Sequence, residues 1–264
     1  MDVIEDKWDW EKRFGAWVKE DDGFGRYPWV VNVHSPFTPA RRALPMLNLA
    51  LISTAGAYID GTEPFDISSK DGDMEFREIP IEVEAGDLKY AAKGYDPASV
   101  ISDRNCQIPI DRLLEYQQNT VIGSLNSVWW SLSSHIPNAG RIADETAPKL
   151  AERLARYEVQ AALIIPASKL CHQTVGVIAR GIEKAGIPTM TIAVDMEVID
   201  KVRPPRTAYY DGKLGSVAGT ADHSEYQLRI LDAALRWIEP FDQPGARKLA
   251  VDLQTEVEIA RGER

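Results

Sequence analysis

Residues 159–194 decide the fold class, and they read VQAALIIPASKLCHQTVGVIARGIEKAGIPTMTIAV. The apolar run at 159–165 predicts a buried strand, the stretch at 170–185 predicts a helix, and residues 189–194 predict the next strand. The Gly-Ile-Pro that follows the helix is the usual punctuation of a helix C-terminus. A strand, a helix and a strand within about 35 residues predict a right-handed crossover between two parallel strands.

The rest of the chain extends this pattern. Residues 60–108 are polar and interrupted by Gly and Pro, so we expect an irregular cover or insertion there. The other expected elements are a buried strand over 47–53, helices beginning at 109 and covering 149–157 and 225–238, and a short strand over 120–123. These alternating elements predict an α/β fold with a doubly wound, mostly parallel sheet of the Rossmann or flavodoxin-like kind.

An arm and a tail are expected to flank this domain. Residues 1–36 predict an N-terminal helical arm rich in Trp, in which Trp10, Phe14 and Trp17 share helical spacing. This aromatic face packs on its own domain or, since Trp is enriched in interface cores, contacts another subunit. Residues 37–240 form the α/β domain, and residues 241–264 are expected to be a C-terminal helical tail.

The composition excludes several classes of partner. The 264 residues carry a formal net charge of −10, which argues against nucleic acid and against an anionic membrane surface. The first residues lack the basic and apolar regions of a secretory signal, and no apolar stretch approaches the roughly 20 residues that cross a bilayer. With only Cys106 and Cys171 present, we expect free thiols and a cytoplasmic location.

The turn after the strand at 159–165 is the first candidate site, because ligands of open parallel sheets bind at the carboxyl ends of strands. Cys171 lies in the first helical turn, where unpaired N–H groups favour an anion, so it is the candidate nucleophile. His172 is the candidate acid/base group, and Ser168 and Thr174, three residues to either side of Cys171, are candidate hydrogen-bond donors. The alternatives are a buried Cys that acts as a small hydrophobe and a Ser168 that caps the helix.

Charged residues near two turns are candidates for binding the substrate. Arg and carboxylate side chains could hold a zwitterionic substrate, or the charges around Pro109 could form a self-satisfied network of ion pairs. The candidates are Asp96, Asp103, Asn105 and Arg112 around Pro109, and Asp195, Glu197, Arg203 and Arg206 after the strand at 189–194.

Several common sites have no counterpart in the sequence. It contains no GxGxxG or GxxxxGK[ST] loop for nucleotides, no HExxH or CxxC, and no GxSxG elbow. The four His residues are scattered without the spacing of zinc ligands. We therefore predict neither a metal nor a bound cofactor.

Six short segments occur together in the order of one known family. They are DRNCQIPIDRL at 103–113, VIGS at 121–124, DETAP at 144–148, CHQTVG at 171–176, AGIPT at 185–189 and KVRPPR at 201–206. Over about residues 45–240 the chain thereby resembles the glycine/sarcosine/betaine reductase selenoprotein B family, which includes the D-proline reductase subunit.

The resemblance implies reductive cleavage of a C–N bond in a small amino-acid-like substrate. In active members a selenocysteine, followed by Cys three residues on, is the reactive centre, electrons come from dithiols or thioredoxin-type partners, and another subunit can supply a pyruvoyl carbonyl. By position the selenocysteine falls on Ser168, the next Cys on Cys171, and a later Cys of some members on Thr174. Ser168 cannot form a selenenyl sulfide or a disulfide, so the redox pair of the family is missing here.

Three functions therefore remain open. The first is a thiol-dependent, oxidoreductase-like enzyme for a small nitrogen-containing substrate, with Cys171 as nucleophile and an external thiol or thioredoxin-type reductant to resolve the adduct. The second is a non-redox hydrolase, lyase or racemase that uses Cys171 with Asp195 or Glu197. The third is a non-catalytic subunit of a reductase-like complex. We expect a homo-oligomer or a hetero-complex formed through the Trp-rich arm.

Overall fold

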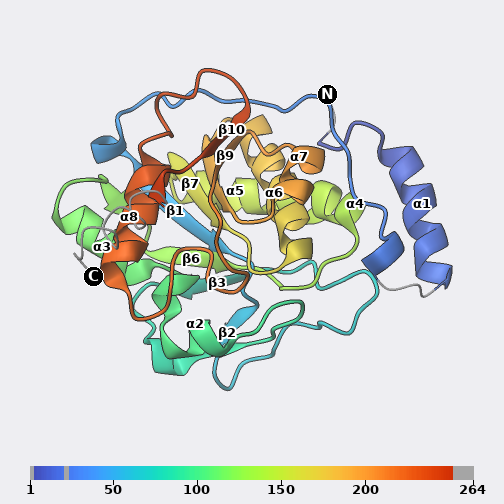
Figure 1. The fold of residues 1–264 in the computed structure, drawn as a ribbon, viewed down its shortest axis with the longest axis horizontal. Coiled ribbons are helices and arrows are strands. Elements are labelled where there is room, and N and C mark those ends of the chain that lie inside the picture. Colours follow the sequence, from blue (N-terminus) through green and yellow to red (C-terminus); the bar gives the residue numbers. More distant parts are fainter. Residues whose placement is uncertain (1–2, 21–23, 252–264) are drawn as a thin grey trace.

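The central sheet is mostly parallel, with the strand order β10-β9-β8-β7-β1-β6-β3 and β5 beside β1 (Figure 1). The computed structural model describes residues 3–20 and 24–251. The strands are β1 (Asn48–Ser53), β3 (Arg77–Pro80), β5 (Ser124–Leu125), β6 (Val128–Ser131), β7 (Ala161–Ile165), β8 (Thr189–Ala193), β9 (Arg206–Tyr209) and β10 (Gly245–Lys248). Only β3 runs antiparallel, against β6. A separate antiparallel pair is formed by β2 (Ala57–Ile59) and β4 (Leu88–Tyr90).

The strand order places a topological switch point between β1 and β7. In chain order the six longer parallel strands are β1, β6, β7, β8, β9 and β10. In the sheet, the first of these strands, β1, lies between the second, β6, and the third, β7. This is the flavodoxin-like order, in which the chain winds away from β1 in both directions. β1, β7 and β8 read as nearly continuous apolar runs because both faces of a parallel sheet are covered. The predicted doubly wound fold is confirmed.

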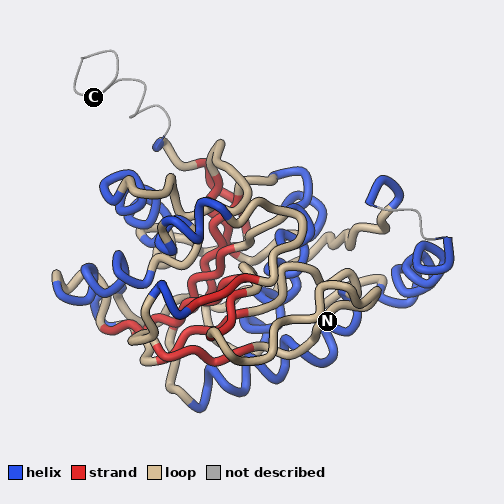
Figure 2. The backbone as a smooth tube through the Cα atoms, turned by 90° about the horizontal axis from the view of Figure 1, so that it is seen from below, coloured by secondary structure: helices blue, strands red, loops and turns tan. Residues whose placement is uncertain are grey.

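Helices cover the two faces of the sheet. Figure 2 shows the strands with helices on both sides of them. One face packs against α5 (Ala147–Arg156), α6 (Lys169–Lys184) and α7 (Met196–Val202), and the other against α3 (Ile110–Gln118) and α8 (Ser224–Leu235). The short helices are α2 (Ala98–Ser102) and α4 (Ala139–Arg141). The buried faces of these helices form two apolar clusters that the sheet separates.

The N-terminal arm contains the predicted helix, α1 (Lys7–Glu20), and packs on its own domain. Trp10 and Phe14 are buried and stack with ring centroids 4.9 Å apart. Arg180, fully buried on α6, donates from Nε to the carbonyl of Val3 and from Nη1 to that of His34, which fastens both ends of the arm. Of the two alternatives predicted for the arm, packing on its own domain therefore describes the buried aromatic face.

One predicted element is wrong, and another differs in the part that the structure describes. Residues 120–123 form a turn, since Thr120 adopts a left-handed φ of 57°, and the short strand β5 begins directly after it at Ser124. Gly123 in that turn has no room for a side chain, because a Cβ would lie 2.8 Å from the carbonyl oxygen of Leu47. The expected helical tail at 241–264 instead begins with strand β10, and residues 252–264 lie outside the described residues.

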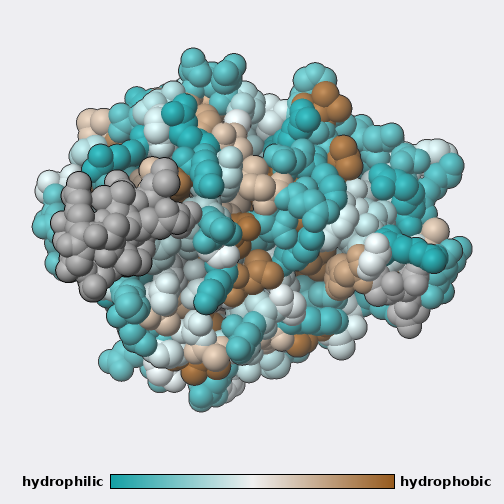
Figure 3. All heavy atoms as spheres, in the orientation of Figure 1, coloured by the Kyte–Doolittle hydropathy of each residue, from teal (hydrophilic) through white to brown (hydrophobic). Residues whose placement is uncertain are grey.

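The surface is described by the hydropathy of its residues. The face seen in Figure 3 is mainly hydrophilic, with separate apolar clusters. Within residues 3–20 and 24–251, no helix combines the length and the apolar character needed to cross a bilayer.

Candidate functional site

The predicted turn lies at the switch point of the sheet. The N–H of Thr54, just after β1, donates to the carbonyl of Ile165, and the N–H of Ala167 donates to Oγ1 of Thr54 at 3.1 Å. These bonds join the carboxyl ends of β1 and β7 and fix the start of α6 between them. Open α/β sheets bind their ligands at this position.

Ser168 caps α6, which was the alternative predicted for it. Its Oγ accepts the N–H of Cys171 at 3.2 Å and lies 3.4 Å from the carbonyl oxygen of Ser134, to which it donates. Gly94, with a φ of +84°, packs directly on Ser168, because a Cβ at Gly94 would lie 3.1 Å from the Cβ of Ser168. The side chain is held firmly at the edge of a cavity.

Cys171, in the first turn of α6, is only 1% exposed. Its Sγ lies 3.3 Å from the carbonyl oxygen of Ser134 and 3.6 Å from that of Thr54. In both contacts the S–H group is the donor, because a carbonyl oxygen only accepts hydrogen bonds. The other thiol, Cys106, contacts the carbonyl of Gly215, and burial raises its pKa to about 11.

His172 does not line the cavity, so its predicted acid/base role has no direct contact with the cavity in this geometry. Its Nε2 accepts the N–H groups of Val194 and Asp195 at 3.1 and 3.2 Å, so the proton is on Nδ1, which donates to the carbonyl of Ser168 at 2.8 Å. Burial lowers the pKa of His172 to about 4 and keeps the imidazole neutral. This residue joins the turn after β7 to the turn after β8.

Thr174 also points away from the cavity. Its Oγ1 lies 3.4 Å from the carbonyl oxygen of Leu170 in the preceding turn of the same helix, and the side chain is fully buried. The prediction that it donates a hydrogen bond to a substrate does not fit this arrangement.

A cavity of about 390 Å³ opens beside Ser168. We call it the Ser168 cavity, and it is lined by Phe24, Gly25, Trp29, Lys93, Gly94, His135, Ser168, Lys169, Leu170 and Glu197. The arm, the segment after β4, the segment after β6 and the start of α6 all contribute to its wall.

The charges of the Ser168 cavity lie mostly at its rim. Lys169 donates to Glu197 at 2.7 Å, and Lys201 donates to the other carboxylate oxygen at 2.9 Å. Hydrogen bonds from Lys169 and then Lys201 lower the pKa of Glu197 to about 2, so it stays ionised. Lys93 donates from Nζ to the carbonyl of Ile67. The cavity therefore offers both signs of charge to a ligand.

His135 is the functional candidate that sequence reasoning did not identify. Its side chain is 7% exposed, and its ring packs edge-on against Phe24 with centroids 5.6 Å apart. No described residue forms a hydrogen bond with its ring nitrogens. Burial, and then the charge of Lys93, lower the pKa of His135 to about 4. A neutral imidazole whose nitrogens have no hydrogen bond to a described residue thus lines the cavity. The sequence around His135 does not distinguish it from the other His residues, because its role depends on residues that are near it only in the folded chain.

The candidates around Pro109 form the self-satisfied network. Asp103 accepts from the backbone of Asn105 and from the side chain of Gln227, and the side chain of Asn105 donates to Asp111 at 2.7 Å. Arg112 pairs with Glu115 at 3.2 Å. Exposed Asp96 accepts the N–H of Ala98. None of these four candidates lines the Ser168 cavity.

Of the candidates after β8, only Glu197 lines the cavity. Asp195 caps α7 by accepting the N–H of Val198, and it lies 3.7 Å from Nζ of Lys169. Arg206 is fully buried in an ion pair with Glu183 at 2.5 Å. Arg203 follows α7, which runs in the direction opposite to the parallel strands. Arg203 therefore lies at the end of the sheet where β9 and β10 begin, away from the Ser168 cavity. Neither Arg203 nor Arg206 lines the Ser168 cavity, so their predicted substrate-binding roles have no support from this cavity.

Fold and site together define a flavodoxin-like α/β protein with a polar, partly aromatic cavity at the switch point. The chain belongs to the glycine/sarcosine/betaine reductase selenoprotein B family, whose sequence profile matches residues 31–167. The predicted family is confirmed. The matched region includes Lys93, Gly94 and His135 and ends just before Ser168.

Three curated relatives are similar to this chain. The chain is 27% identical to the D-proline reductase subunit gamma of Acetoanaerobium sticklandii over 209 residues, which are 79% of this chain and 85% of that protein. It is 27% identical to the glycine reductase complex component B subunit gamma of Symbiobacterium thermophilum and 25% identical to the sarcosine reductase complex component B subunit beta of Peptoclostridium acidaminophilum. These two matches cover 63% of this chain but only 39% and 38% of the relatives. No solved structure matches.

Proposed function

We propose that this chain takes part in a reductase-like reaction on a small amino-acid-derived substrate, which it binds in the Ser168 cavity as a subunit of a larger complex. The family supports the reductase-like part, and the relatives' names, each a subunit of a reductase, support the complex. The observation that carries the binding part is the cavity itself. It lies at the switch point, beside the residue that corresponds to the selenocysteine of active members.

The rim charges suit a ligand with a carboxylate and an amine. The ammonium group of Lys169, together with the N-terminus of α6, would hold the carboxylate, and Glu197 would hold the amine. His135 would meet the reacting part of the substrate as a neutral group able to accept or donate a proton.

The thiol chemistry assigned to Cys171 needs a movement. In this proposal Cys171 is the nucleophile and an external thiol or thioredoxin-type reductant resolves the adduct. Because the thiol is buried against the carbonyl groups of Ser134 and Thr54, the residues around it must shift before Sγ meets a substrate. The burial of Cys171 favours a second candidate, a subunit that binds the substrate without carrying redox chemistry itself.

Calorimetric titration tests the binding site. We expect glycine, sarcosine, betaine or D-proline to bind the purified chain. The variants His135→Gln and Lys169→Gln should weaken binding about tenfold or more, since each removes a polar partner. Arg112→Gln, whose partner Glu115 lies outside the cavity, is the matched control and should bind normally. Absence of binding, or equal binding by all variants, would refute the Ser168 cavity as the substrate site.

Thiol labelling separates the two candidates. The measurement is the rate of alkylation of Cys171 with and without the bound substrate, with buried Cys106 as the internal reference. If Cys171 is the nucleophile, it reacts faster than Cys106, and Cys171→Ala abolishes turnover with dithiothreitol while the substrate still binds. If the chain is a binding subunit, the two thiols react equally slowly and Cys171→Ala leaves the activity of the complex unchanged.

A further inference from the structure

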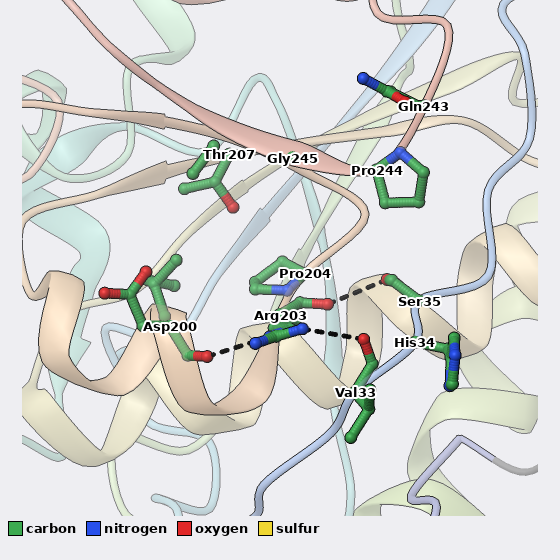
Figure 4. Close-up of a pocket in the computed structure, with 12 residues that line it drawn as sticks. Val33, His34, Ser35, Asp200, Arg203, Pro204, Thr207, Gln243, Pro244 and Gly245 are labelled. Atoms are coloured by element: carbon green, nitrogen blue, oxygen red, sulfur yellow. Dashed lines mark hydrogen bonds between the residues drawn. The ribbon is translucent and has the colours of Figure 1, made fainter.

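A second cavity, of about 710 Å³, lies at the opposite edge of the sheet, where β9 and β10 begin (Figure 4). Its wall is formed by the end of α7, the start of β9, the segment at 33–35 and the residues before β10. It shares no lining residue with the Ser168 cavity. We call it the Arg203 cavity.

The family segment KVRPPR builds this cavity. Arg203 adopts a left-handed conformation with a φ of 51°, which is uncommon outside glycine. Its Nε lies 3.3 Å from the carbonyl oxygen of Asp200 and its Nη1 lies 2.9 Å from that of Val33, while its own carbonyl accepts from Oγ of Ser35 at 2.9 Å. Figure 4 shows the guanidinium between its two acceptors. A backbone conformation of this kind persists only where the surroundings hold it in place.

A buried hydroxyl without a partner lies in the wall. Thr207 on β9 is fully buried, and its Oγ1 forms no hydrogen bond within the described part of the chain. Figure 4 shows this oxygen directed toward Pro204 on the cavity side. Thr191, its register partner on β8, has an equally unpaired hydroxyl but does not line the cavity. An unpaired buried hydroxyl is unfavourable, and a ligand that bonds to it removes that cost.

Two opposite charges in the same cavity remain available. Nη2 of Arg203 has no partner among the described residues, although the other guanidinium nitrogens do. Asp200 is exposed, and no described residue pairs with its carboxylate. A cation and an anion that both line one cavity suit a ligand that carries both charges, and they do not suit a simple anion or cation.

We propose that the Arg203 cavity binds the zwitterionic head group of a free α-amino acid. The ligand carboxylate bonds to Nη2 of Arg203 and to the hydroxyl of Thr207, and the ligand ammonium group bonds to the carboxylate of Asp200. This site is separate from the proposed substrate site and does not depend on the proposed function.

Thermal denaturation with each standard α-amino acid except glycine tests this proposal, because glycine is already a proposed ligand of the Ser168 cavity. Acetate and ethylamine serve as probes that carry a single charge. At least one amino acid should raise Tm, and neither single-charge probe should. Asp200→Asn should abolish the shift. Thr207→Val keeps the shape of the side chain, so the free protein should be at least as stable as the wild type while ligand affinity falls about tenfold.

Two controls locate the binding event. Thr191→Val removes the neighbouring unpaired hydroxyl and should keep the full ligand-induced shift. His135→Gln alters the Ser168 cavity and should keep it too. The proposal is overturned if no amino acid raises Tm, if Asp200→Asn and Thr207→Val respond like the wild type, or if His135→Gln alone removes the response, which would place binding in the Ser168 cavity.

Discussion

The hydroxyl of Ser168 accepts the backbone N–H of Cys171 at 3.2 Å, so the residue on which the family resemblance places the selenocysteine caps the helix that carries the thiol. Both side chains also lie within 3.4 Å of the same carbonyl oxygen, that of Ser134. In this chain a structural hydrogen bond therefore occupies the position at which active members of the family are expected to carry a redox pair.

Restoring a redox-active atom at this position should create a thiol pair. In Ser168→Cys the two thiols stand three residues apart across the first turn of α6, the spacing of Cys-x-x-Cys motifs. We expect oxidation to join the introduced thiol to Cys171, seen as the loss of two hydrogens in mass spectrometry and of two titratable thiols. Ser168→Ala is the control for the lost cap, which should cost about 1 kcal/mol of stability. A variant that keeps both thiols reduced under oxidising conditions would contradict the close approach of the two side chains.

The two buried His residues should make stability fall in mild acid. The folded pKa values of His172 and His135 are about 4, below the ordinary value of 6.5, because burial disfavours the charged form. A depressed folded pKa contributes stability that is fully present above pH 6.5 and is lost as the pH falls toward 4. Between pH 7 and pH 5 the fully buried His172 should account for a loss of about 2 kcal/mol, and His135, which is screened more by solvent, for a smaller loss.

Urea denaturation at several pH values measures this loss. His172→Gln and His135→Gln should each show a flatter pH dependence than the wild type. The control is His34→Gln, because the side chain of His34 is 68% exposed, and this variant should keep the full slope. Parallel curves for all four proteins would exclude neutral buried His as the cause.

Arg206 should matter for stability and not for substrate binding. It pairs with fully buried Glu183, and it lies 4.0 Å above the ring of Phe37. Arg206→Met leaves a buried carboxylate without its cation, which typically costs about 3–5 kcal/mol. The measurement is the free energy of unfolding together with ligand affinity. Arg112→Gln, at a partly exposed pair, should change stability by less than about 1 kcal/mol. Weaker ligand binding by folded Arg206→Met would reinstate its predicted binding role.

Gln173 should control the wall of the Ser168 cavity. Its Oε1 accepts the N–H of Val30 at 2.8 Å, and its Nε2 donates to the hydroxyl of Tyr27 at 2.6 Å. In Gln173→Leu both bonds are lost, so hydrogen exchange should accelerate at residues 27–30 and substrate affinity should fall. Thr174→Val, on the same helix but bonded only within it, is the matched control. Unchanged exchange at 27–30 in Gln173→Leu would show that the aromatic packing of the arm alone holds this wall.

The crossover unit is the part of the fold that sequence reasoning describes best. Helix α6 spans Lys169–Lys184 against the predicted 170–185, and β7 and β8 lie within the predicted strands. β6 was missed because Val128–Ser131 is a short run with two adjacent Trp residues and no alternation. Such a strand depends on its neighbours, here β1 on one side and β3 on the other.

The sequence by itself determined the local and the familial features of this protein. Apolar periodicity specified the crossover, Ser168 is a good helix cap in any fold, and six ordered segments indicated the family. Only the tertiary structure decided which side chains share a cavity. His135 and Lys93 meet Ser168 because the segments after β4 and β6 converge at the switch point, although they are far apart in the chain. Arg203 is separated from these three residues because α7 reverses the chain direction. Distances between residues far apart in the chain depend on long-range packing, which no local sequence pattern predicts.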